Sequence, residues 1–127
     1  MSIHYEALGV IEDGRGHVFE PIKEESLCEQ KNIHVVLSGP GVIRGNHCHE
    51  KGTETMAVMG PALVAVRDHG DIQEIDVPPG AVYRFIFPPG QSHAVKNLSG
   101  EMNVLVAFNT VVHDRQHPDT TADVLLT

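Results

Sequence analysis

Nine histidines stand out in this chain of 127 residues, and three of them lie with one glutamate at spacings that could hold a metal ion. His47 and His49 are separated by one residue, so on a β-strand both side chains point to the same face. Glu54 opens the next expected strand after a short turn, and period-two alternation with Met56 places it on that inward face. His93 follows a Pro-Pro-Gly turn at the start of a later expected strand.

Imidazole and carboxylate ligands form a site of intermediate hardness, which suits zinc, iron, manganese, nickel or cobalt better than calcium or magnesium. We therefore expect one divalent transition metal ion, with zinc as the first choice, held by these four side chains. A single histidine on a strand is more often a surface or hydrogen-bonded residue than a ligand. The expectation depends on the four positions taken together.

Short strands must position these residues. After residue 32, β-branched and aliphatic runs alternate with Gly- and Pro-containing turns, and apolar residues never recur at helical spacing for a dozen positions. The expected strands are Ile33–Ser38, Val42–Cys48, Thr55–Met59, Ala62–Arg67, Ile72–Val77, Val82–Phe87, His93–Lys96 and Asn103–Asn109. About eight strands at this spacing predict an all-β fold, either a jelly-roll barrel or a sandwich.

The two ends of the chain are less regular. Residues 12–16 form a Gly-rich turn, a polar stretch with Cys28 follows, and Ala122–Leu126 is a possible last edge strand. No change of composition marks a linker, so we expect a single domain over residues 1–127.

Composition excludes several classes of protein. The chain is 41% hydrophobic and 20% charged, without an apolar run near the roughly 20 residues of a membrane-spanning helix. Its N-terminus lacks the basic and apolar regions of a secretory signal, so we expect a cytoplasmic protein with Cys28 and Cys48 reduced. A net charge of -8 repels nucleic acid, so we expect no nucleic-acid partner, and the charge says nothing specific about small substrates.

The spacings around the four residues resemble the two sequence motifs of the cupins. The first motif, Gly-x5-His-x-His-x(3,4)-Glu-x6-Gly, is matched from Gly41 to Glu54, and its closing Gly60 comes one residue early. The second, Gly-x5-Pro-x-Gly-x2-His-x3-Asn, is matched from Pro88 to Asn97, and its leading Gly80 lies two residues too far upstream. The resemblance implies a cupin double-stranded β-helix, a jelly-roll barrel with a three-His, one-Glu metal site inside.

Longer stretches resemble one branch of the cupins. Residues 13–20 and 30–47 look like the dTDP-4-dehydrorhamnose 3,5-epimerases and the sugar 3,4-ketoisomerases. Residues 44–49 and 113–120 are most similar to the C-terminal cupin domain of bifunctional capsular-polysaccharide epimerase/reductases. This resemblance implies a metal-supported epimerase or isomerase that acts on a nucleotide-linked keto-sugar in polysaccharide biosynthesis, and a homodimer paired through its N-terminal strands.

The same resemblance implies roles for single residues. In the rhamnose epimerases the His after Arg-Gly is the general base, which corresponds to His47 here. The early Arg-Gly and a later Glu hold the nucleotide diphosphate, which corresponds to Arg15 and Glu20, with Arg44 near the sugar or phosphate. His49 replaces the glutamine of those metal-free epimerases. If His47 binds a metal ion, it is therefore not available as a base.

Two other functions stay open at this point. Three His and one Glu leave coordination positions free on a six-coordinate ion, as a metal-dependent dioxygenase or lyase requires. A non-catalytic, sugar-binding cupin would need the fold without the acid and base. Metal analysis and a nucleotide-sugar binding screen distinguish these alternatives from an epimerase.

Overall fold

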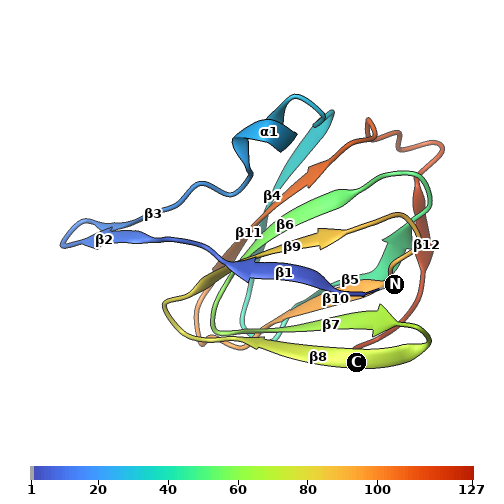
Figure 1. Ribbon diagram of the computed structural model, residues 1–127. Coiled ribbons are helices and arrows are strands. Elements are labelled where there is room, and N and C mark those ends of the chain that lie inside the picture. Colours follow the sequence, from blue (N-terminus) through green and yellow to red (C-terminus); the bar gives the residue numbers. More distant parts are fainter. Residues whose placement is uncertain (1) are drawn as a thin grey trace.

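The computed structural model describes residues 2–127 and contains two five-stranded sheets that face each other (Figure 1). The first sheet consists of β1 (His4–Ala7), β9 (Val82–Phe87), β6 (Glu54–Met59), β11 (Asn103–Asn109) and β4 (Asn32–Ser38), in this order. The second consists of β12 (Thr120–Ala122), β5 (Ile43–His49), β10 (His93–Asn97), β7 (Ala62–Asp68) and β8 (Asp71–Val77). Neighbouring strands are antiparallel throughout. This is the expected jelly-roll architecture.

The core lies between the two sheets and follows from period-two alternation. Val64 and Val66 of β7 and Phe85 and Phe87 of β9 are almost fully buried. They belong to one apolar cluster with Val58 of β6. Burying an aliphatic or aromatic side chain of this kind stabilises the fold by about 1.5–3 kcal/mol. The packed core makes the sheets a rigid frame for the side chains at their ends.

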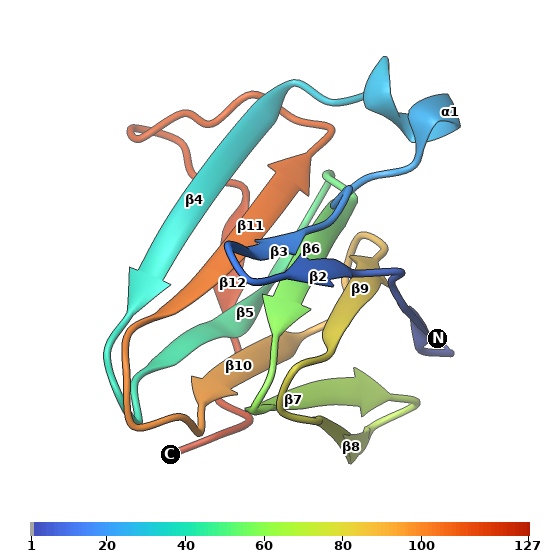
Figure 2. The ribbon, with the colours of Figure 1, turned by 90° about the vertical axis from the view of Figure 1, so that its left-hand side faces the viewer.

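The N-terminal region contains elements that the sequence did not predict. β1 pairs with β9 at the edge of the first sheet. The hairpin of β2 (Ile11–Asp13) and β3 (Gly16–Val18) projects from the barrel as an arm, which Figures 1 and 2 show from two sides. Its Ile11 and Val18 are 72% and 65% exposed. A single-turn helix, α1 (Glu24–Leu27), follows. Within residues 2–127, no helix has the length and hydropathy needed to cross a bilayer.

The eight strands predicted between residues 33 and 109 are confirmed, with each end within one residue of the prediction. The predicted last strand, Ala122–Leu126, is wrong. β12 occupies Thr120–Ala122 instead, where it pairs with β5. The amides of Leu125 and Leu126 donate to the Asn46 side chain, so side-chain hydrogen bonds replace a strand ladder there.

A β-bulge in β5 decides which way its side chains point. His47 lies opposite His93, but Gly45 lies opposite Ala94, so Asn46 is an extra residue in β5. Gly45 has a φ of 90°, and a Cβ atom there would lie 2.8 Å from the His93 carbonyl oxygen. Only glycine fits this close approach without strain. The bulge brings Arg44 opposite the core residue Val95, on the inner face of the sheet.

Candidate metal centre

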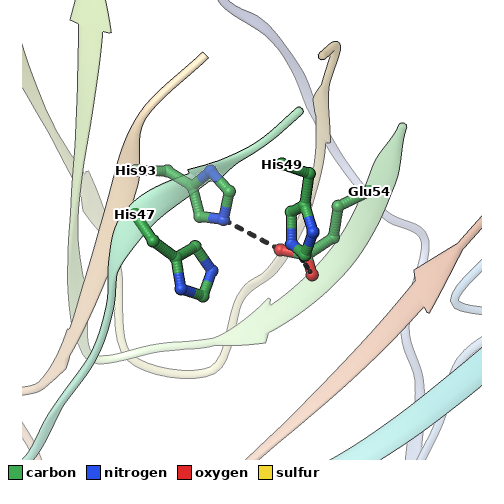
Figure 3. A group of neighbouring side chains, drawn as sticks. All are labelled: His47, His49, Glu54 and His93. Carbon is green, nitrogen blue, oxygen red and sulfur yellow. Dashed lines mark hydrogen bonds and ion pairs between the residues drawn. The ribbon is translucent and has the colours of Figure 1, made fainter. Parts of the chain in front are cut away.

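The four predicted ligands come together at one end of the barrel (Figure 3). His47 and His49 lie near the end of β5, while Glu54 begins β6 and His93 begins β10. One nitrogen or oxygen atom from each of the four side chains lies within 4.8 Å of the others. Ligand atoms about 2.1 Å from one ion lie at most about 4.2 Å apart, so small adjustments of the side chains would place all four on one ion.

His93 is held rigidly with one nitrogen directed into the site. Its side chain is fully buried, and its ring stacks on Phe87 with centroids 3.9 Å apart. The Nδ1 atom lies 3.1 Å from the Gln91 carbonyl oxygen, which can only accept a hydrogen bond. We therefore assign the hydrogen to Nδ1, which leaves the lone pair of Nε2 facing the Glu54 carboxylate (Figure 3).

His49 and Glu54 form the other close pair. The Nε2 atom of His49 lies 3.0 Å from Oε2 of Glu54. On the other side of the ring, Nδ1 lies 3.4 Å from the Asn109 amide nitrogen and 4.0 Å from an Asp119 carboxylate oxygen. Asp119 also accepts hydrogen bonds from the amides of Lys51 and Gly52, in the turn before β6. Asn109 and Asp119 thus form the outer layer of the site around His49.

The electrostatics leave the site ready to bind a cation. Burial alone would raise the pKa of Glu54, but the neighbouring imidazoles of His49 and His93 outweigh it and lower that pKa to about 2. Burial, with the nearby His93 second, lowers the pKa of His47 to about 4. At neutral pH Glu54 is therefore a carboxylate and His47 offers a lone pair.

The surroundings of two buried atoms in the site show whether these residues fit a metal ion. His93 Nε2 and Glu54 Oε1 lie 2.9 Å apart, yet neither has a hydrogen-bond partner of acceptable geometry among residues 2–127. Buried polar atoms without a partner are costly, and two acceptors that face each other repel. A cation bound by both atoms removes the cost, so the donor set fits a divalent transition metal ion.

A cavity of about 60 Å³ adjoins this cluster. It is lined by His49 and Glu54 and also by Asn32, His34 and His113. None of these three residues was singled out from the sequence. Asn32 and His34 share the inward face of β4 with Val36, an alternation that could have identified them. His113 lies in the segment between β11 and β12, where no periodicity points to the cavity.

The remaining predicted site residues lie elsewhere in this chain. Arg15 is at the tip of the arm, 91% exposed, and is paired with Asp13. Glu20 is exposed just after the arm. The Arg44 side chain donates to the Ser38 hydroxyl and the Leu37 carbonyl oxygen, which ties β5 to β4. Of the predicted catalytic and substrate-binding residues, only His47 is part of the cluster. The ring of Tyr83 stacks on that of Tyr5.

Comparisons with known proteins place this barrel in a family. No curated protein sequence matches the chain. Among solved structures, it is similar to the capsular polysaccharide assembling protein CapF from Staphylococcus aureus, with 26% identity and a TM-score of 0.68 over 93% of this chain and 34% of that one. The chain therefore spans about a third of CapF.

Two further structures share the fold at lower identity. One is ChmJ, a 3'-monoepimerase from Streptomyces bikiniensis in complex with dTDP-quinovose, with 17% identity and a TM-score of 0.76 over 94% of this chain and 68% of that one. The other is QdtA, a sugar 3,4-ketoisomerase from Thermoanaerobacterium thermosaccharolyticum in complex with TDP, with 16% identity and a TM-score of 0.68 over 95% and 88%.

The family model described as the polysaccharide biosynthesis C-terminal domain matches residues 11–121, which is most of the chain. That span includes the arm, every strand except β1 and the last residue of β12, and all four residues of the cluster. The chain belongs to the polysaccharide biosynthesis C-terminal domain family.

Proposed function

We propose that this protein binds one divalent transition metal ion and acts as an epimerase or isomerase on a nucleotide-linked keto-sugar in polysaccharide biosynthesis. The observation that carries the proposal is the convergence of three imidazoles and a carboxylate, with two buried atoms that lack partners in the described chain. His47, His49, Glu54 and His93 would hold the ion, and zinc is the first choice of metal.

A bound metal ion would polarise a sugar carbonyl and stabilise the negative charge that develops on its oxygen. The protein supplies the other parts of the chemistry. His47 and His49 are fixed by the β5 ladder, and His93 by its stacking on Phe87. The cavity beside His49 and Glu54 gives a substrate group access to the site. Because His47 serves as a ligand in this proposal, the base that removes the proton is another residue.

The substrate class is supported by the family and by the named relatives. CapF assembles a capsular polysaccharide, while ChmJ and QdtA were crystallised with a dTDP-sugar and TDP. In a chain of net charge -8, a diphosphate needs a local cationic group. Arg15 could provide one only if the arm reaches a site outside its own barrel, since the arm projects away from the two sheets (Figure 1).

We therefore include a homodimer in the proposal, in which the arm of one copy lies at the site of the other. An isolated two-stranded hairpin is marginally stable in water, and this one exposes Ile11 and Val18. Docking on a second copy would bury these side chains and bring Arg15 and Glu20 toward a bound nucleotide.

The test is deuterium exchange from solvent. The purified protein, loaded with zinc, is incubated in D₂O with dTDP- and UDP-linked 4-keto sugars, and the hydrogen on the carbon beside the carbonyl is followed by NMR. We expect its signal to disappear, or a new sugar isomer to form, only with metal-loaded protein. Binding without exchange would indicate a non-catalytic sugar-binding cupin. The absence of binding and exchange with every sugar would contradict the proposal.

A further inference from the structure

The lining of the cavity beside the candidate metal ligands includes a pair of histidines. His34 comes from β4, and His113 from the segment that joins β11 to β12. Their rings are 5.5 Å apart and meet edge to face at 79°. Both residues line the same cavity as His49 and Glu54. Two imidazoles outside the cluster therefore line the same cavity as two of the candidate ligands.

The strand register fixes how His34 lies relative to the ligands. On the inner face, Glu54, Asn109 and Asn32 form one row across β6, β11 and β4. His34 stands in the next row, opposite the core residue Ala107. Neighbouring strands are about 4.8 Å apart, so β4 is roughly 10 Å from β6. β11 lies between them, so Glu54 and His34 stand on the inner face of the sheet with one strand separating their strands.

The other ionisable side chains that line the cavity accept backbone hydrogen bonds or belong to the candidate metal centre. Asp119 accepts the amides of Lys51 and Gly52. Asp114 accepts the amides of Gln116 and His117, which lower its pKa. Glu54 and His49 belong to the candidate metal centre. Among the residues that line the cavity, His34 and His113 are thus the titratable groups left for proton transfer.

The surroundings of His34 suit a proton-transfer residue. The amide nitrogen of Asn32 lies 3.3 Å from Nδ1 and 3.4 Å from Nε2 of the ring. The two distances are nearly equal, so the Asn32 amide contacts the ring without selecting one of its two nitrogens. The contact with His113 restrains the ring from the other side. Imidazole is the side chain used most often for general acid–base catalysis.

We propose that His34 is the acid–base residue of this site and that His113 positions its ring. This inference rests on the proposed function. His34 accepts the proton from the carbon beside the sugar carbonyl, the C–H electron pair becomes the double bond of an enolate, and the carbonyl π pair moves to oxygen. Water then protonates the carbon from the opposite side, and His34 releases its proton to solvent. Atoms and charge balance without an oxidant or reductant.

The experiment compares His34→Gln, His113→Gln and His117→Gln in the deuterium-exchange assay with the 4-keto sugar that wild type exchanges fastest. His117 is a matched control, because it lies in the same segment but does not line the cavity. Loss of a general base should slow kcat of His34→Gln by roughly 10²–10⁴-fold, with KM and metal content unchanged. His113→Gln should be slowed less, and His117→Gln should match wild type.

Chemical rescue with imidazole distinguishes the loss of an acid–base group from a structural defect in the His34 variants. Added imidazole should restore exchange in His34→Ala, where the missing ring leaves space, and should have no effect on His34→Gln. Wild-type rates in His34→Gln, or a change in KM alone, would overturn the inference while the proposed function stands. A wild-type protein that exchanges no proton with any sugar would overturn both.

Discussion

His93 and Glu54 present two buried atoms to each other, Nε2 and Oε1, at a distance of 2.9 Å and outside hydrogen-bond geometry. The Gln91 carbonyl oxygen accepts the hydrogen of His93 Nδ1, so the neutral ring presents the lone pair of Nε2 to the Glu54 carboxylate. The fold thus holds two acceptor atoms in contact. Only a proton or a cation between them relieves their repulsion. This relationship is the main structural reason for proposing a metal ion.

The outer layer of the site should control metal affinity. Asp119 lies 4.0 Å from His49 Nδ1 and holds the turn before Glu54 through two backbone amides. We expect Asp119→Asn to weaken zinc binding roughly 10- to 100-fold, because groups that orient metal ligands typically contribute this much. Competition with a chromophoric chelator measures the affinity. The control is Asp114→Asn, in the same segment, and an equal loss in both variants would contradict a specific role for Asp119.

The bulge at Gly45 should be sensitive to a single methyl group. A Cβ atom at Gly45 meets the His93 carbonyl oxygen at 2.8 Å, and its φ of 90° is unfavourable for alanine. Gly45→Ala should lower the free energy of unfolding by about 1–3 kcal/mol. At Gly14, in the arm, a Cβ atom would meet nothing within 4 Å. Urea denaturation of both alanine variants provides the comparison, and equal stabilities would show that the bulge relaxes easily.

How much the sequence predicts depends on whether a feature is local. His47 and His49 could be placed on one face because alternation in a strand is local, and the turns around Glu54 and His93 limited where the chain could go. Asn97, the last residue of the second motif, donates its side-chain amide to the carbonyl oxygens of Ser38, Gly39 and Glu101.

Features that depend on register or on polar segments were missed. β1, β2 and β3 are three or four residues long and exposed along their length, so no hydrophobic alternation marks them. Arg44 faces inward only because of the bulge, which a period-two count does not include. His34 and His113 meet through the pairing of β4 with β11 and the path of the segment after it. No local pattern encodes that contact.

The C-terminal segment should be loosened by acid. Hydrogen bonds from Arg67 and then Ser92 lower the pKa of Asp123 to about 2, from an ordinary value of 3.8. Because the folded pKa is depressed, this stabilisation is present above pH 3.8 and is lost as the pH falls toward 2. The Asp123 side chain is 30% exposed, so we expect Asp123→Asn to cost less than about 1 kcal/mol at pH 7. In urea denaturation, the difference in the free energy of unfolding between Asp123→Asn and wild type should vanish near pH 2. A constant difference would contradict the assignment.

The arm should contribute to nucleotide binding through the dimer. Arg15→Ala removes a charge-assisted contact to the diphosphate, so we expect binding of a dTDP- or UDP-sugar to weaken roughly ten- to a hundredfold without a change in metal content. Lys96→Ala removes the same charge from the outer face of β10 and should have no effect. Calorimetric titration at matched salt measures both, and analytical ultracentrifugation measures the dimer. A monomeric protein, or an Arg15→Ala variant that binds nucleotide sugars as tightly as wild type, would exclude this role.

The most direct test of the metal centre is the metal content of the purified protein, measured by inductively coupled plasma mass spectrometry after incubation with zinc and dialysis. Wild type should contain about one transition metal ion per chain, with an affinity that falls as the pH is lowered because protons compete for the imidazoles. The double variant His47→Ala, His49→Ala should contain none, while its far-UV circular dichroism keeps the β-sheet signal. Full metal occupancy in that variant, or none in wild type, would contradict the account.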